Sequence, residues 1–247
     1  VIYGFVPNFK FFPESLIGDV YRLFVDIFSV LVLLGVFYFL LRRFLLNDSR
    51  LVIDEPVMLS EKAKKGMLLD SLLVGSFIII HIGSRFLSAS FEIALSGPDS
   101  SQPAANIVAR LWLGLPIDTL HFFEHLTWWL ALGLILAFLP YFPFSKHAHL
   151  FMGPLNIMAS VNRKSMAAIE TIDFEDENLE QFGASQLQHL PQTQLLDAYA
   201  CIQCSRCQDA CPAYETGKEL SPSALEINKR YFMNENISAL ANGESVD

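Results

Sequence analysis

Charged residues and cysteines are both scarce in this chain of 247 residues. Only 17% of the residues are Asp, Glu, Lys or Arg, and the net charge is −9. The sequence has no stripe of basic residues, which argues against a nucleic-acid-binding surface. The four cysteines all lie between residues 201 and 211. They are spaced too closely to form several disulfide bridges, and such bridges would also require an oxidising compartment.

The four cysteines form a single run with a recognisable spacing. Cys201, Cys204, Cys207 and Cys211 follow the order C-x2-C-x2-C-x3-C, and Pro212 comes directly after them. This is the ligand run of a bacterial-type [4Fe–4S] cluster. Zinc sites generally use two separated C-x2-C pairs instead. We therefore expect an iron–sulfur cluster here, and we expect the run to face the reducing cytoplasm.

A second cysteine run is absent from the sequence. In two-cluster proteins of this type, the fourth cysteine of each run ligates the other cluster. Cys211 is therefore expected to bind a second cluster. Because the chain begins with Val1 rather than Met and stops soon after a predicted helix over 221–232, we expect the sequence to be a piece of a longer polypeptide, or its ordered part.

Apolar residues make up 52% of the chain and include 21 Phe, and they concentrate in the first 145 residues. Three segments reach the about 20 apolar residues that a membrane-spanning helix needs: residues 23–41, 67–95 and 117–141. None resembles a cleaved signal peptide, and their length and repetition argue against buried core helices. The segment 107–115 is too short to span, so we expect an interfacial helix with Trp112 at headgroup level.

The distribution of basic residues predicts how the three spans are oriented. The loop from 42 to 65 contains six of them, whereas the loop from 96 to 116 contains only Arg110. The first loop is therefore expected in the cytoplasm. The third span then returns the chain to the side where the cysteine run is expected. An acidic segment from 170 to 180 is most simply a solvated linker, although it would also suit docking of a basic partner or flavoprotein.

Five of the six histidines lie in or beside the predicted spans: His81, His121, His125, His147 and His149. Ionisable residues at membrane depth are rare and are treated as functional by default, and histidine is a common axial ligand of haem iron. His125 lies about 12 Å along its helix and matches the depth of His81 better than His121 does.

We therefore predict a haem b site ligated by His81 and His125. Arg85 lies one turn from His81 and could pair with a haem propionate. The alternative is structural: His81 would hydrogen-bond a neighbouring helix, and Arg85 would pair with Glu92.

The membrane part resembles a known family. The segment LLGVFYFLLRRFLL, the basic loop, the next span and a last span ending in PFSKHAH resemble the final three helices of the gamma subunit of respiratory nitrate reductase. The resemblance implies that His149, at the end of the PFS motif, ligates the haem nearer the cytoplasm. The family's other ligand on that helix falls at Ala131, which cannot ligate. Either upstream helices supply partners for His149, or a haem has moved to His81 and His125.

The segment from Phe182 and Gly183 through LLDAYACIQCSRCQDACPAYETGKELSP resembles the iron–sulfur part of heterodisulfide reductase-like oxidoreductases. Both parts are fused in electron-transfer-flavoprotein:menaquinone oxidoreductases, and the resemblance covers about residues 23–230. It implies an all-α fold with a transmembrane helix bundle at 1–150, a linker at 151–190 and a partial α-helical ferredoxin-like [4Fe–4S] domain at 191–247. The family's second cysteine run and its cysteine-rich modules are absent from this sequence.

The resemblance implies a membrane-bound, quinone-linked oxidoreductase in the bacterial cytoplasmic membrane. Electrons from a soluble donor such as an electron-transfer flavoprotein would pass through [4Fe–4S] clusters and haem b to a menaquinone-type quinone, and the reverse direction is equally allowed. Asp70, Asp118 and Glu124 are candidates for proton uptake, although helix capping or solvation explains each as well. Other subunits of a membrane complex are expected partners.

Two other functions are alternatives to this one. The chain could be a membrane anchor or assembly subunit of a larger respiratory or photosynthetic complex, with no redox role. An anchor needs no histidine pair at matched depth, so haem distinguishes the two. A succinate dehydrogenase-like role is disfavoured because those enzymes usually place the membrane and cluster parts on different chains.

Overall fold

The computed structural model of the chain describes residues 15–46, 48, 58–160, 175, 183–244 and 246. All regular secondary structure within these residues is helical, which confirms the all-α prediction. The chain divides into two compact units. The first comprises Val1–Val52 and Leu69–Tyr141, and the second comprises Ile53–Leu68 and Phe142–Asp247. The predicted domain boundaries at 150 and 190 stay predictions.

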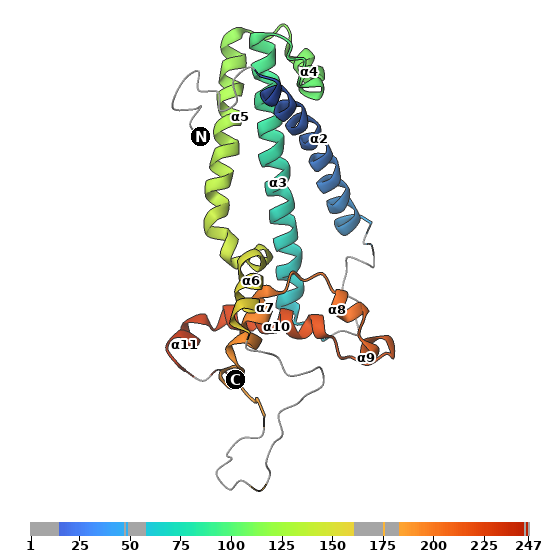
Figure 1. The fold of residues 1–247 in the computed structure, drawn as a ribbon, viewed down its shortest axis with the longest axis vertical. Helices are drawn as coiled ribbons and strands as arrows, with labels where there is room; N and C mark the ends of the chain where they lie inside the picture. The colour runs from blue at the N-terminus through green and yellow to red at the C-terminus, as the bar shows by residue number, and fades with distance from the viewer. Residues whose placement is uncertain are drawn as a thin grey trace. The chain divides into compact units, whose positions relative to one another are not determined.

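Three long helices dominate the first unit (Figure 1). They are α2 (Leu16–Phe44), α3 (Glu61–Ser96), whose first turns belong to the second unit, and α5 (Ile117–Tyr141). All three are long and apolar enough to cross a membrane. Large apolar side chains such as Phe24, Leu34 and Leu136 are more than half exposed, as expected where lipid replaces water around a helix. The three predicted spans are therefore confirmed as helices.

Helix α2 begins earlier than the apolar run predicts. The Ser15 side chain accepts a hydrogen bond from the Gly18 N–H at 3.3 Å and caps the helix. Such a cap satisfies a backbone donor that has no partner within the helix. The cap, and not the start of the apolar run, therefore sets this end.

A short helix, α4 (Pro103–Ala109), and a 3₁₀ turn, η1 (Arg110–Trp112), lie between α3 and α5. Asp26 on α2 is buried and accepts hydrogen bonds from the backbone N–H groups of Ala104 at 2.7 Å and Ala105 at 3.0 Å. These donors belong to the first turn of α4 and have no partner within that helix. Asp26 therefore caps α4 from another helix. The predicted helix over 107–115 is therefore helical as far as Trp112 but not over 113–115, and its interfacial position stays a prediction.

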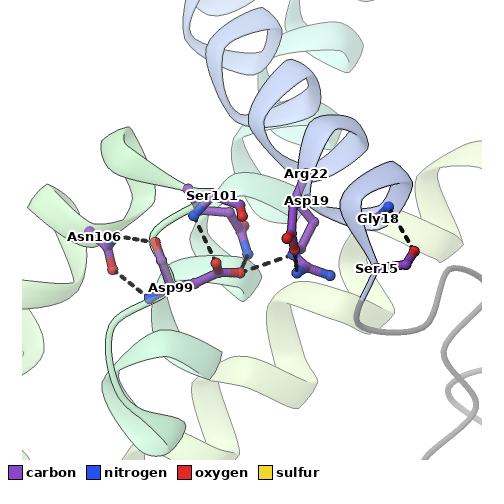
Figure 2. Close-up of polar contacts among 8 residues, drawn as sticks. Ser15, Gly18, Asp19, Arg22, Asp99, Ser101 and Asn106 are labelled. Carbon is purple, nitrogen blue, oxygen red and sulfur yellow. Dashed lines mark hydrogen bonds and ion pairs between the residues drawn. The ribbon is translucent and has the colours of Figure 1, made fainter.

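The loop before α4 is fixed by Asp99 (Figure 2). Its carboxylate accepts hydrogen bonds from Ser101 N at 2.8 Å and Gln102 Nε2 at 2.9 Å, and it forms an ion pair with Arg22 Nε at 3.1 Å. Burial raises the pKa of Asp99, but the hydrogen bonds from Gln102 and Ser101 and the charge of Arg22 outweigh this and hold the pKa below its ordinary value. The charged form of Asp99 therefore stabilises this loop.

The second unit consists of short helices around the first turns of α3. They are η2 (Phe142–Phe144), η3 (Lys146–Ala148), α6 (His149–Ala159), η4 (Leu187–His189), α7 (Gln192–Ala200), α8 (Arg206–Asp209), α9 (Pro212–Glu215), α10 (Pro222–Glu235) and α11 (Ile237–Ala241). Helix α6 packs against α7, and Asn156 donates to Asp197 across the pair at 2.5 Å. The helix predicted over 221–232 is confirmed as α10.

A small apolar core joins α10 to the first turns of α3 in the second unit. It consists of buried Leu59, Ala63, Met67, Ala224 and Ile227. Polar contacts flank this core: Asn228 accepts from Ser60 N at 3.0 Å and donates to the Met58 carbonyl at 2.7 Å. These contacts hold α10 against the first turns of α3. Other residues of α10 and its N-cap contact the cysteine run.

Candidate cofactor-binding sites

The four cysteines lie on the short segment between α7 and α9. Cys201 follows the last residue of α7, Cys204 lies in the loop, Cys207 is within α8, and Cys211 directly precedes α9. None of them forms a disulfide. Cys201 and Cys211 are half-buried, whereas Cys204 and Cys207 are exposed. The segment therefore presents four free thiols in the order that the spacing predicts.

The backbone around Cys204 has an unusual conformation. Gln203 and Ser205 have φ angles of 60° and 59°, in the left-handed region that non-glycine residues seldom occupy. Such strain persists where the surrounding structure requires it and concentrates at functional sites. The backbone N–H of Gln203 points to the Cys201 sulfur at 3.4 Å. Hydrogen bonds to ligand sulfurs are one of the means by which proteins tune iron–sulfur clusters.

Helix α10 supports this segment through buried polar contacts. The side chain of Gln208 in α8 is buried and accepts a hydrogen bond from the Ser221 hydroxyl, and Ser205 lies 3.5 Å from the Ser223 hydroxyl. Burial raises the pKa of the Cys201 thiol, although the Gln203 N–H lowers it. A metal ligand must lose its proton, so binding would release it. In residue type, spacing and support, the segment fits a [4Fe–4S] cluster.

His81 lies near the middle of α3 and is half-buried. Its Nδ1 atom is 3.0 Å from the carbonyl oxygen of Ala131 on α5, and its ring stacks parallel to that of Phe77. A contact of this kind is expected if His81 has only a structural role and hydrogen-bonds a neighbouring helix. A metal-ligating histidine also generally donates its other ring N–H to such a group. The contact therefore fixes the orientation of His81 and suits either role.

His81 and Arg85 line one cavity of about 410 Å³ between α3 and α5, together with Glu92, Glu124 and Trp128. The structure therefore brings together two of the predicted haem residues and the predicted alternative partner of Arg85. His125 does not line this cavity.

The side chain of His125 is 69% exposed, and its Nδ1 lies 3.7 Å from Glu124 Oε2. His121 Nδ1 lies 3.5 Å from the same oxygen. The ligand atoms of these three residues lie within 4.8 Å of one another, close enough to hold a metal ion. The structure thus groups His125 with His121 and Glu124. The i, i+3, i+4 spacing of the three residues is the sequence signal for this arrangement.

His149 begins α6 in the second unit, and its Nδ1 lies 2.7 Å from the Lys146 carbonyl. The preceding turn is held by Arg230 on α10, which is 3% exposed and donates from Nη2 to the carbonyl oxygens of Ser145 and, at 3.4 Å, Phe144. Sequence reasoning missed Arg230, because a basic residue in an amphipathic helix gives no sign of being buried.

The three acidic residues that are candidates for proton uptake, Asp70, Asp118 and Glu124, differ in how far they are buried. Asp118 is exposed near the start of α5, and Glu124 lies in the histidine group described above. Asp70 is buried on α3 and accepts a hydrogen bond from the Tyr141 hydroxyl at 2.6 Å. Solvation therefore does not explain Asp70.

Two curated proteins are similar to this chain over most of its length. The probable iron–sulfur-binding oxidoreductase FadF of Bacillus subtilis (strain 168) is 34% identical over 227 residues, which cover 91% of this chain and 30% of that protein. The EtfAB:quinone oxidoreductase of Syntrophomonas wolfei is 28% identical over 213 residues, which cover 82% of this chain and 28% of that protein. No family model and no solved structure matches the chain.

The chain spans less than a third of the length of these relatives. Their names support the predicted resemblance to iron–sulfur oxidoreductases of the EtfAB:quinone type. The likeness of the membrane part to the nitrate reductase gamma subunit stays a prediction, as do the assignments of haem ligands to His81, His125 and His149.

Proposed function

We propose that this chain is the membrane part and first iron–sulfur part of an oxidoreductase that exchanges electrons between an electron-transfer flavoprotein and the quinone pool. The observation that carries the proposal is the presence, in one chain, of a [4Fe–4S]-type cysteine run and three helices able to cross a membrane. The names of the two similar proteins support both the iron–sulfur and the quinone parts of the proposal.

The cysteine segment would hold the cluster through Cys201, Cys204 and Cys207, while Cys211 would ligate a second cluster. When bound, such clusters supply one-electron transfer. The chain contributes the environment of the sulfurs, because the Gln203 N–H and the packing of α8 on α10 control hydrogen bonding and burial there. These are the quantities that set cluster potentials.

The membrane helices would hold haem b. His81 is the candidate ligand in the cavity between α3 and α5, and Arg85 in the same cavity would face a propionate. His149 would ligate a haem together with a helix outside this sequence, whereas His125 would need to leave its contact with Glu124. Haem, like the clusters, would supply one-electron transfer when bound.

The proposal includes a location and an orientation. The protein would cross the bacterial cytoplasmic membrane several times, with the basic loop and the cysteine segment on the cytoplasmic side. A flavoprotein in the cytoplasm could then reach the cysteine segment, where two of the four thiols are exposed.

The first test compares two substitutions in the same loop of the full-length protein. Replacing the exposed ligand, Cys204→Ser, is expected to remove or reshape the electron paramagnetic resonance signal of the reduced clusters. Replacing its exposed neighbour, Ile202→Ser, places the same residue two positions away and should leave the signal unchanged. An identical signal in wild type and Cys204→Ser would overturn the cluster assignment.

The second test is a reduced-minus-oxidised visible spectrum of the purified protein, with haem quantified per chain. A b-type spectrum that changes in His81→Ala supports the haem assignment in the α3–α5 cavity. Iron without haem, and no electron transfer from a reduced flavoprotein to a naphthoquinone, would instead favour the membrane-anchor function.

A further inference from the structure

We propose that Tyr141 and Asp70 form the polar end of a quinone head-group site between α3 and α5. The inference rests on the proposed quinone-linked function and deepens it, because it assigns the quinone to residues of this chain. It also predicts that the protonation state of Asp70 controls quinone binding.

Asp70 is the first observation. The residue is 8% exposed, in a helix long and apolar enough to cross a membrane. One carboxyl oxygen, Oδ1, accepts the Tyr141 hydroxyl at 2.6 Å. The other, Oδ2, is buried and accepts no hydrogen bond from the residues that the structure describes. A buried polar atom in this state costs about 1–3 kcal/mol, so its retention calls for a functional explanation.

The cavity beside Tyr141 is the second observation. It measures about 300 Å³ and is lined mainly by apolar side chains of α3 and α5, including Phe77, Leu134 and Phe138, together with Ser76 and Tyr141. The rings of Phe77 and Phe138 stack 4.5 Å apart, and Phe138 lies 5.9 Å from the Tyr141 ring. An apolar cavity with few polar groups is typical of a ligand site, and it suits the apolar ring of a quinone.

Other occupants fit this cavity less well. Its lining residues include no His, Cys or Met. Tyr141 could in principle ligate haem iron, but its hydroxyl donates to Asp70, so haem would have to displace that contact. A lipid acyl chain would fill the apolar part but would make no use of a buried Tyr–Asp pair. A quinone uses both features, because its ring is apolar and flat and its carbonyl oxygens accept hydrogen bonds.

The hydrogen bond between Tyr141 and Asp70 determines how the site would work. Tyrosine has a single O–H donor, and in the structure that donor is used by Asp70. When Asp70 is protonated, its own O–H can donate to the Tyr141 oxygen, and the tyrosine O–H is released to donate to a quinone carbonyl. Quinone binding would then be accompanied by uptake of one proton at Asp70.

The charged and titratable groups around Asp70 are identifiable. Tyr141 faces it from α5, and the guanidinium of Arg43 on α2 lies close enough to interact with its charge. Because quinone binding is proposed to take up one proton at Asp70, lower pH should favour binding.

The test measures binding of 2,3-dimethyl-1,4-naphthoquinone to the full-length protein in lipid nanodiscs by calorimetry. Loss of one hydrogen bond in Tyr141→Phe should weaken binding about 5- to 10-fold. The matched variant Tyr38→Phe removes a hydroxyl from α2, where Tyr38 contacts Arg42, and should bind as wild type does. Asp70→Asn mimics the protonated acid, so it should bind at least as tightly as wild type and lose the dependence on pH.

A second variant protects the test against misfolding. Ala137→Leu fills the cavity without touching the polar pair and should weaken binding by at least 10-fold, whereas Leu136→Phe, on the neighbouring exposed face of α5, should not. Binding to wild type that is unaffected by both Tyr141→Phe and Ala137→Leu would overturn the assigned site and leave the proposed function intact. Failure of wild type to bind the naphthoquinone at all would overturn both.

Discussion

The contact of Arg230 with the turn before His149 leads to a quantitative prediction. Arg230 is 3% exposed, donates to the carbonyl of Ser145 and lies 5.5 Å from the centre of the Tyr199 ring. Replacing it with methionine keeps an unbranched side chain but leaves the Ser145 carbonyl without this donor. A charged hydrogen bond contributes about 1.5–3 kcal/mol, and the contact with the ring about 0.5–2 kcal/mol.

A smaller change in free energy opposes this loss of stability. Arg230 Nη1 is buried and makes no hydrogen bond within the described residues, so methionine removes one unfavourable group. We expect a net loss of about 2–3 kcal/mol, which corresponds to about a 30- to 150-fold increase in local opening.

Hydrogen exchange of the peptide covering residues 142–149, measured on the full-length protein, tests this prediction. Arg230→Met should lower protection of this peptide by about that factor, and Arg230→Lys should have an intermediate effect because it keeps the charge. Arg206→Met removes an exposed arginine from α8 and should leave the peptide unchanged. Equal protection in wild type and Arg230→Met would refute the conclusion that α10 fixes this turn.

Three further predictions concern Asp26, Asp99 and Gly66. Asp26→Ala leaves two N–H groups of α4, one buried and one partly buried, without their acceptor, so hydrogen exchange at Ala104 should show a loss of about 2–4 kcal/mol. The pKa of Asp99 lies below its ordinary value of 3.8, so its stabilisation is complete above that pH and is lost as the pH falls further. Hydrogen exchange of its loop should rise on acidification in wild type but not in Asp99→Asn. A Cβ at Gly66 would lie 2.3 Å from the Tyr231 ring, so Gly66→Ala should lower the thermal stability by about 1–3 kcal/mol, whereas Gly133→Ala has open space and should not.

The sequence predicts the three long helices well because lipid imposes a simple rule on them. A spanning helix must be apolar over about 20 residues, and such a run is visible without any tertiary information. The ends are harder to predict. Helix α3 begins at Glu61, well before its apolar run, because Ala63 and Met67 pack against α10 in the second unit. The two segments are more than 150 residues apart in the sequence, and no local pattern reveals their contact.

For the cysteine segment, the sequence predicts the ligands but not the backbone conformation. Its spacing identifies the ligands and the kind of cluster, because the chemistry demands four thiolates in a short segment. The left-handed backbone at Gln203 and Ser205 could not be predicted, since glycine or asparagine usually marks such positions. Tertiary packing of α8 against Ser221 and Ser223 of α10 accompanies this conformation. Here the sequence predicts the chemistry, and long-range contacts determine the geometry.

The acidic residues of the long helices show why burial alone does not identify a functional site. Asp26 and Asp70 are both carboxyl groups within apolar helices, and both are buried. Both oxygens of Asp26 accept backbone N–H groups of α4, so a structural role accounts for it completely. Asp70 uses one oxygen for a tyrosine that lines an apolar cavity and leaves the other without a hydrogen bond within the described residues. The contact with the tyrosine therefore accounts for only one of its two oxygens, and the proposed quinone site rests on this difference from Asp26.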